Sequence, residues 1–189
     1  MHYCCYVITR VFPSDDAIGE MLEPFHEEHE DRGEGERPPF EWDWWEVGGR
    51  YNGKFKLKVD KDDEQVYQWK YALPTPRAGR LFRSYALEEG RAAALSTKPA
   101  FMYEEEKFLN SMGMREGFIY CDGAPMADII NIEEQAVECY CLVDADGAGY
   151  SREHWNGEDW VVNDQFDEQC RKIVSERKDC YITVVDLHD

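Results

Sequence analysis

The sequence predicts an α+β domain whose mixed, mainly antiparallel sheet has its first and last strands at the centre and helices packed on it. Three observations lead to this prediction. β-Branched and aromatic residues fill two runs near the ends of the chain, residues 3–12 and 180–187. Asp-Gly pairs at 122–123 and 146–147 separate short apolar segments, as in hairpins. Apolar residues also recur at helical spacing, most clearly over residues 166–174.

The N-terminal quarter predicts a strand, a helix and a loop in that order. The run YCCYVITRVF suits a buried strand, and Ser14 is a plausible N-cap for the helix that follows. Apolar residues between Ile18 and Phe25 form one face of this helix, and Pro24 ends it. Residues 27–41 are charged and contain Gly and Pro, which predicts an acidic loop.

The middle of the chain predicts a half-exposed strand, an irregular arm and two helices. Residues 54–59 alternate between basic and apolar side chains, as in a strand with one buried face. Residues 73–84, LPTPRAGRLFRS, predict a basic irregular arm, and residues 85–96 and 100–112 predict helices. The residues of the strand that we expect to face inward are Phe55, Leu57 and Val59.

The last third of the chain predicts two hairpins, a helix and the closing strand. Residues 117–120 and 126–130 pair across the turn at Asp122-Gly123 in the first hairpin. The second turns at residues 144–147. Asn163-Asp164 then caps a helix, and the apolar residues on its buried face are Phe166, Cys170, Ile173 and Val174.

Composition bounds the class of protein. A chain of 189 residues with 43% hydrophobic residues suits a single domain spanning residues 1–189. Its 40 acidic residues exceed its 21 basic residues, and the net charge is -19. This charge argues against direct binding to nucleic acid and against attachment to an anionic membrane. The seven cysteines show no regular framework and no C-x-x-C pair, which predicts reduced thiols. We find no secretory signal and expect a cytoplasmic protein.

The charge is divided into three zones along the chain. Residues 1–46 carry a net charge of -10 and residues 99–189 carry -14, whereas residues 47–98 carry +5. Two interpretations remain open for the basic zone. It packs against the acidic zones within the fold, or its arginines converge on an anion. The second interpretation involves Arg50, Arg77, Arg80 and Arg83.

The segment WDWWEVGGRYNGKF, residues 42–55, is the strongest candidate for a ligand site. Its doubled glycine allows positive φ and could present backbone amides to an anion, and Arg50 could add a guanidinium. The alternative is a structural corner that buries the indoles, with Arg50 paired to Asp43 or Glu46. The candidate ligand-binding residues are Trp42, Trp44, Trp45, Gly48, Gly49, Arg50, Arg80 and Arg83.

A metal site has weaker support in the sequence. Asp186 and His188 alternate on the closing strand and so point to one side, where His154, or an acid such as Asp144, could join them as a third ligand. The glycine motifs of nucleotide-hydrolysing and dinucleotide-binding proteins do not occur. We expect no cofactor, and we favour a protein without catalytic activity.

Three segments resemble small uncharacterised proteins of bacteriophages and prophages. The segments are WDWWEVGGRYNG, LVDADGAGYSREHW and the closing ITVVDLH. The first resembles a tryptophan-rich Gly-Gly-Arg pattern of those proteins, and the other two resemble a hairpin and a final Val-Val-Asp-x-His strand. The resemblance implies a phage origin, and hence a location in the host cell, but no reaction.

These observations leave three functional hypotheses. The first is a phage accessory protein that binds a basic surface of a host protein, such as an acidic inhibitor of a defence protein of the anti-CRISPR kind. The second is a protein that binds a nucleotide or another phosphate ligand at the Gly-Gly-Arg segment, and the third is a metal-dependent hydrolase. For the first hypothesis, the candidate partner-binding acids are Glu27, Glu28, Glu30, Asp31, Glu34 and Glu36.

Overall fold

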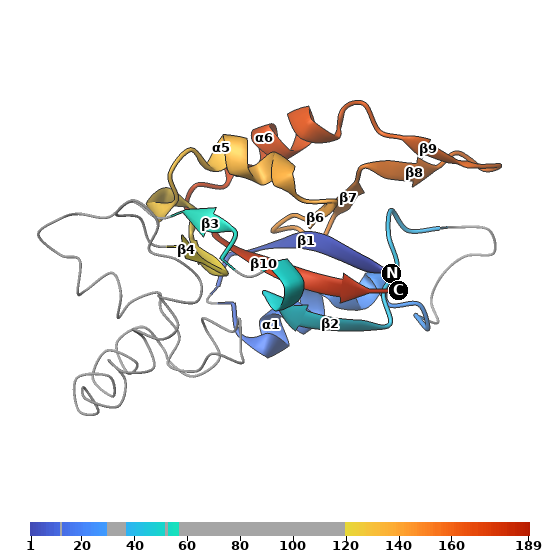
Figure 1. Ribbon diagram of the computed structural model, residues 1–189, viewed down its shortest axis with the longest axis horizontal. Coiled ribbons are helices and arrows are strands. Elements are labelled where there is room, and N and C mark those ends of the chain that lie inside the picture. Colours follow the sequence, from blue (N-terminus) through green and yellow to red (C-terminus); the bar gives the residue numbers. More distant parts are fainter. Residues whose placement is uncertain (12, 30–36, 52, 57–119) are drawn as a thin grey trace, which may run out of the picture.

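A mixed sheet lies at the centre of the structure, a computed structural model that describes residues 1–11, 13–29, 37–51, 53–56 and 120–189 (Figure 1). Its six strands include the first and the last strand of the chain side by side in the middle, which confirms the α+β class and the central position predicted for both. The strand order is β2 (Trp44–Val47), β10 (Tyr181–His188), β1 (His2–Thr9), β6 (Cys141–Val143) and β7 (Gly149–Ser151), and β5 (Gly123–Pro125) also pairs with β10.

The ladder between β1 and β10 is the longest in the sheet. The two strands are antiparallel and pair from His2 opposite His188 to Thr9 opposite Tyr181. On its other edge β1 pairs with β6 in the parallel sense. Helices cover both faces of the two central strands, so their side chains are buried on both sides. This explains why both sequences are almost continuously apolar instead of alternating.

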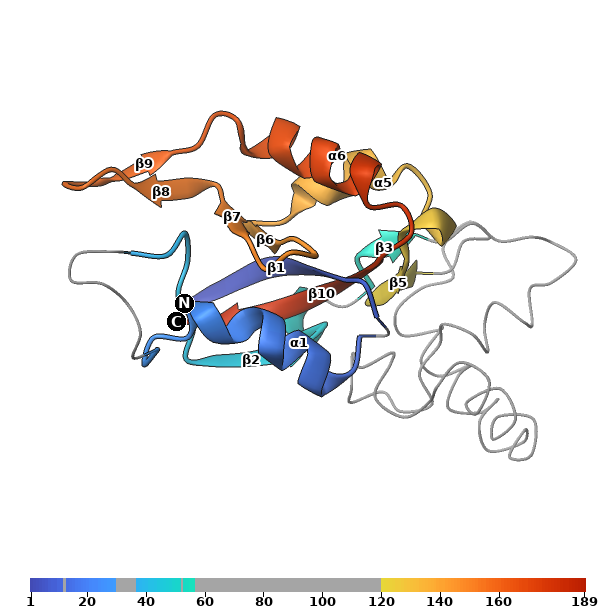
Figure 2. The same cartoon turned by 180° about the vertical axis from the view of Figure 1, so that it is seen from behind.

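Helices cover the sheet on two sides, as Figures 1 and 2 show from opposite directions. Helix α1 (Asp15–Leu22) packs on one face, and α5 (Ile132–Gln135) with α6 (Phe166–Glu176) packs on the other. The predicted cap of α1 is confirmed, because Ser14 Oγ accepts a hydrogen bond of 3.1 Å from Ala17 N. The α-helix ends just before Pro24, as predicted, and continues as one 3-10 turn (Glu23–Phe25).

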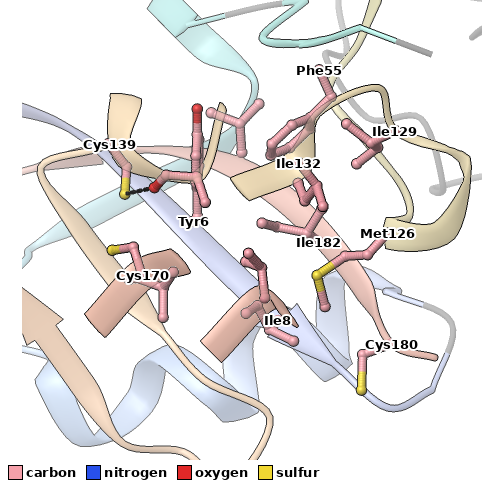
Figure 3. Close-up of a cluster of buried hydrophobic side chains, with 14 of the residues drawn as sticks. Tyr6, Ile8, Phe55, Met126, Ile129, Ile132, Cys139, Cys170, Cys180 and Ile182 are labelled. Atoms are coloured by element: carbon pink, nitrogen blue, oxygen red, sulfur yellow. Dashed lines mark hydrogen bonds between the residues drawn. The ribbon is translucent and has the colours of Figure 1, made fainter. Parts of the chain in front are cut away.

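Each face of the sheet carries its own hydrophobic core. The core beneath α5 and α6 contains Tyr6, Phe55, Phe166 and Ile182, all buried (Figure 3). The core beneath α1 takes the alternate residues of the same strands. Its members include Val7, Ile18, Leu22, Phe25, Val185 and Leu187. Phe55 therefore faces inward as predicted, while Leu57 and Val59 lie outside the described residues.

Shorter elements complete the described part of the chain. They are β3 (Phe55–Lys56) with β4 (Tyr120–Cys121), β8 (Glu153–Trp155) with β9 (Trp160–Val162), and the 3-10 turns Gly49–Tyr51, Met126–Asp128 and Ala136–Glu138. Within the residues that the structure describes, no helix has the length and apolar character needed to cross a bilayer. The predicted arm at 73–84, the helices at 85–96 and 100–112, and residues 30–36 of the acidic loop lie outside the described residues.

One predicted hairpin is confirmed and the other is wrong. Strands β6 and β7 pair around the turn at residues 144–147, in which Gly147 has φ +85°. Strands β4 and β5 flank Asp122 but do not pair with each other. β4 pairs with β3, whereas β5 pairs with β10, and residues 126–128 form a 3-10 turn instead of a return strand. Pairing of β5 with the long strand β10 thus replaces the local hairpin that the Asp122-Gly123 turn predicts.

Two tyrosine hydroxyls, one with and one without a hydrogen-bond partner, give a matched test of the packing. The hydroxyl of Tyr6 is buried without a hydrogen-bond partner among the described residues, whereas Tyr51 OH donates to His2 O at 3.1 Å. Tyr6→Phe should leave the free energy of unfolding unchanged or raise it, and Tyr51→Phe should lower it by about 1 kcal/mol. Urea unfolding of both variants measures the difference. A Tyr6→Phe variant that loses more stability than Tyr51→Phe would contradict the described packing.

Candidate functional site

The Gly-Gly-Arg corner is built around the buried carboxylate of Asp186. This residue lies on β10 and is 2% exposed. Its Oδ1 is 2.9 Å from His2 Nδ1, and its Oδ2 accepts a hydrogen bond of 2.9 Å from the backbone N–H of Arg50. The turn at Gly49–Tyr51 thus wraps an anion, as the doubled glycine predicted, but that anion belongs to the chain itself.

Gly49 is required for this wrapping. Its φ is +50°, a conformation that residues with a side chain rarely adopt. A Cβ at this position would also lie 2.6 Å from Asp186 Oδ2. Only glycine lets the backbone approach the carboxylate closely enough for the Arg50 amide to donate. The preceding glycine, Gly48, has φ +72° and donates its own N–H to Val184 O at 2.9 Å.

A second imidazole–carboxylate pair adjoins the first. His188 Nδ1 is 2.8 Å from Asp43 Oδ1, and both side chains are about 40% exposed. The rings of His2 and His188 meet edge to face with their centroids 4.8 Å apart. The hydrogen bond from His188 lowers the pKa of Asp43. The corner therefore links Asp186, His2, His188 and Asp43 in one row, through two hydrogen bonds and one edge-to-face ring contact.

The three tryptophans of the segment do not form one binding platform. Trp42 is buried and donates its Nε1–H to Leu22 O at 2.9 Å. Trp45 is partly buried and packs against the same core, beneath α1. Trp44 alone is largely exposed, with 48% of its surface accessible. This arrangement agrees with the interpretation of a structural corner that buries indoles.

The predicted ligand-binding residues are therefore only partly assembled. The backbone amides of Gly48 and Arg50 are used within the chain, and among the described residues Asp43 pairs with His188 and not with Arg50. The guanidinium of Arg50 and the indole of Trp44 face solvent. Arg80 and Arg83 lie outside the described residues. Nucleotide binding at this corner stays a prediction, with two exposed side chains in its favour.

The three weak metal candidates are not brought together as a site. Asp186 and His188 do point to the same side of β10, as predicted, but each contacts a different partner. His154 lies on β8, in a separate two-stranded sheet. Within the described part of the chain, no group of three or more His, Cys, Asp or Glu residues has a metal-binding arrangement.

Of the predicted partner-binding acids, the structure describes two. Glu27 and Glu28 follow the 3-10 turn after α1, and both are exposed. The backbone N–H of Glu27 donates to Trp42 O at 3.0 Å, so the beginning of the acidic loop is attached to the Gly-Gly-Arg corner. Glu30, Asp31, Glu34 and Glu36 lie outside the described residues.

A cavity of about 370 Å³ opens at the same end of the sheet, and sequence reasoning missed it. The rings of Tyr3 and Tyr140 stack in its wall, with centroids 4.8 Å apart and planes inclined by 22°. Its residues come from five separate stretches of the chain, so no local motif reveals it. Among those that line it are Tyr3, Phe40, Glu41, Tyr140, Glu153 and Asp189.

A buried aspartate, Asp122, lies between β4 and the start of β5. Asp122 is fully buried, its Oδ1 accepts a hydrogen bond of 2.6 Å from Gly53 N, and its Oδ2 has no partner among the described residues. Burial is the main cause that raises the pKa of Asp122 to about 7; the hydrogen bond from the Gly53 amide opposes this rise, and the nearby Glu46 adds a smaller contribution to it. Asp122 thus titrates near neutral pH in the folded protein.

No protein-family model matches this chain, and no curated protein or solved structure is significantly similar to it. The resemblance to bacteriophage proteins therefore stays a prediction. Functional inference depends on the geometry of the corner, the cavity and the charged surface.

Replacing Gly49 tests how the corner is held. Gly49→Ala should lower the free energy of unfolding by at least about 2 kcal/mol, because it adds a clash with Asp186 to the strain of positive φ. Gly147→Ala is the matched control, since Gly147 has φ +85° but open space around its Cβ position. It should cost only the strain, about 1 kcal/mol. Equal losses in urea unfolding would show that the carboxylate does not restrict the turn.

Asp122 should make stability depend on pH. Its pKa is about 7 in the folded state against 3.8 normally, so the folded state holds the proton more tightly than the unfolded chain. Its contribution to the free energy of unfolding therefore falls as the pH rises from about 4 to about 7, by roughly 1.4 kcal/mol per pKa unit at most. Asp122→Asn should gain stability relative to the wild type across that range. Urea unfolding at several pH values measures this, with the exposed Asp164→Asn as control; parallel curves for all three proteins would contradict the assignment.

Proposed function

We propose that this protein acts by binding a basic surface of a host protein, as a phage or prophage accessory protein. Its charge suits an acidic inhibitor of a host defence protein that normally holds nucleic acid, with anti-CRISPR proteins as an example of the class. One observation carries the proposal: the described basic side chains are largely engaged within the chain, whereas many acids remain exposed. The phage origin is supported by the three sequence segments that resemble phage proteins.

Ion pairs within the chain involve half of the described lysines and arginines. Arg10 and Arg177 both contact Asp146, and Arg152 contacts Asp167. Arg152 also donates to the backbone carbonyls of Cys139 and Val137. The remaining described pairs are Lys54 with Glu138 and Lys178 with Glu133. These pairs are mostly exposed, and each contributes little to stability. Because acids outnumber bases, the charge that remains after this pairing is negative.

The exposed acids gather on several elements. Asp16 and Glu20 lie on α1, and Glu27 and Glu28 follow it. A second set lies at the far end of the chain, on the β8–β9 turn and on α6. The exposed acids of this second set include Glu158, Asp159, Glu168 and Glu176, and Asp164 lies between β9 and α6. A surface of this kind attracts a basic partner at long range and loses that attraction as salt screens it.

Affinity capture from a bacterial host lysate tests the proposal. We expect the immobilised protein to retain a nucleic-acid-handling protein at about 0.1 M salt and to release it towards 1 M salt, where the Debye length falls from about 10 Å to about 3 Å. Mass spectrometry identifies the retained protein. Binding that is indifferent to salt would contradict recognition by charge.

A pair of double variants locates the contact. Glu27→Lys with Glu28→Lys should weaken capture by at least about tenfold, because both acids belong to the predicted binding loop. Glu168→Lys with Glu176→Lys changes the net charge equally but on α6, and it should weaken capture much less. Equal effects of the two pairs would show that total charge, and not the acidic loop, controls binding.

A further inference from the structure

We propose that the cavity lined by Tyr3, Tyr140 and Glu153 receives the guanidinium group of an arginine side chain on the partner protein. This inference rests on the proposed function, because it names the residue type by which a basic partner would be anchored. The cavity is lined by residues of the β8–β9 hairpin, of the segment 37–41 and of both ends of the chain. Figures 1 and 2 show those two ends side by side.

Aromatic rings form the walls of this cavity. Tyr3 from β1 and Tyr140, just before β6, are stacked, and Phe40 and Trp160 line the cavity with them. Trp160 is 42% exposed and stands edge to face with Trp155 at 6.0 Å between centroids. A planar cation is attracted to the faces of such rings and can lie flat against them.

Carboxylates supply the charge that a cation needs. Glu41, Glu153 and Asp189 line the cavity, against the single guanidinium of Arg37. Tyr140 OH donates to Glu153 Oε2 at 3.0 Å, and Tyr3 OH donates to Asp189 Oδ2 at 3.4 Å. The stacked rings thus orient two carboxylates at the same opening. Burial, followed by the hydrogen bond to Glu153, raises the pKa of Tyr140, so this hydroxyl keeps its proton and its donor role.

Arg37 shows that this hairpin already accommodates a guanidinium. Its Cζ lies 4.8 Å from the centroid of a Trp155 ring, in a cation–π contact at the edge of the cavity. Arg37 therefore stacks on one tryptophan of the hairpin while the neighbouring Trp160 faces the cavity. Arg37 is also a positive charge beside the opening, so it repels an incoming cation. Removing this charge should therefore strengthen binding, whereas removing a carboxylate should weaken it.

An arginine fits these features better than other ligands. The negative charge of the carboxylates repels the phosphates of a nucleotide. A lysine ammonium would satisfy the carboxylates, but it has no plane to lie against the rings and no fork to meet two oxygens at once. Guanidinium combines the plane, the charge and paired donors in one group.

The test uses N-acetyl-arginine methylamide as the probe, titrated into the full chain and followed by the indole N–H signal of Trp160 in two-dimensional NMR. We expect saturable binding with a dissociation constant on the order of 1 mM. The lysine analogue should bind several-fold more weakly. The citrulline analogue, which has the same shape without the charge, should not shift the signal.

Variants assign the binding to this cavity. Glu153→Gln should weaken the arginine probe about tenfold, and Tyr140→Phe should weaken it less, because the stacked ring remains. Arg37→Gln should strengthen it several-fold. Glu158→Gln is the matched control, because Glu158 is exposed on the turn of the same hairpin and does not line the cavity. Dispersed spectra for each variant confirm folding.

Two results would overturn the inference: equal binding of the arginine and citrulline probes, or a Glu153→Gln variant that binds like Glu158→Gln. Failure of the probe with salt-sensitive capture intact would remove the arginine site and leave the proposed function standing. Arginine binding with no captured protein would instead remove the proposed function.

Discussion

The ladder between β1 and β10 is the constraint on which both sites depend. Its antiparallel register places His2 opposite His188 and Tyr3 opposite Leu187, although these residues are separated by almost the whole chain. Hydrogen bonding along eight residue pairs fixes this register, because a slip by one residue would turn every buried side chain to the wrong face. The first and last residues of the chain therefore lie together at one end of this strand pair.

Alternation along that ladder separates the corner from the cavity. His2, Asp186 and His188 continue the row of side chains that builds the core beneath α5 and α6, and there the Gly-Gly-Arg turn covers them. Tyr3, one residue further along β1, points to the opposite face and joins Tyr140 in the wall of the cavity. One strand end thus supports two polar environments on opposite faces of the same sheet.

Apart from the central position of the first and last strands, what the sequence predicted correctly was local. The β-branched and aromatic runs at the two ends, the Ser14 cap and the turn at 144–147 each depend on neighbouring residues, and all three predicted elements are present. What it mispredicted or missed depends on distant pairing. The segment after the Asp122-Gly123 turn pairs with β10 and not with β4, and the cavity is lined by five separate stretches of the chain. The sequence predicted a turn at Gly48-Gly49 that could bind an anion. It did not predict that the side chain of Asp186 would fill this position.

The two environments differ in which groups contact their carboxylates, and this difference is what favours the cavity as a binding site. In the corner, Asp186 and Asp43 meet imidazoles, and Asp186 also meets a backbone amide in a buried setting. In the cavity, Glu153 and Asp189 accept hydrogen bonds from tyrosine hydroxyls, which orient a carboxylate without carrying compensating charge. In the corner, the backbone amides of Gly48 and Arg50 already donate within the chain and are not available to a ligand. A cavity with oriented anions and aromatic walls retains both the charge and the surface that a cationic partner residue requires.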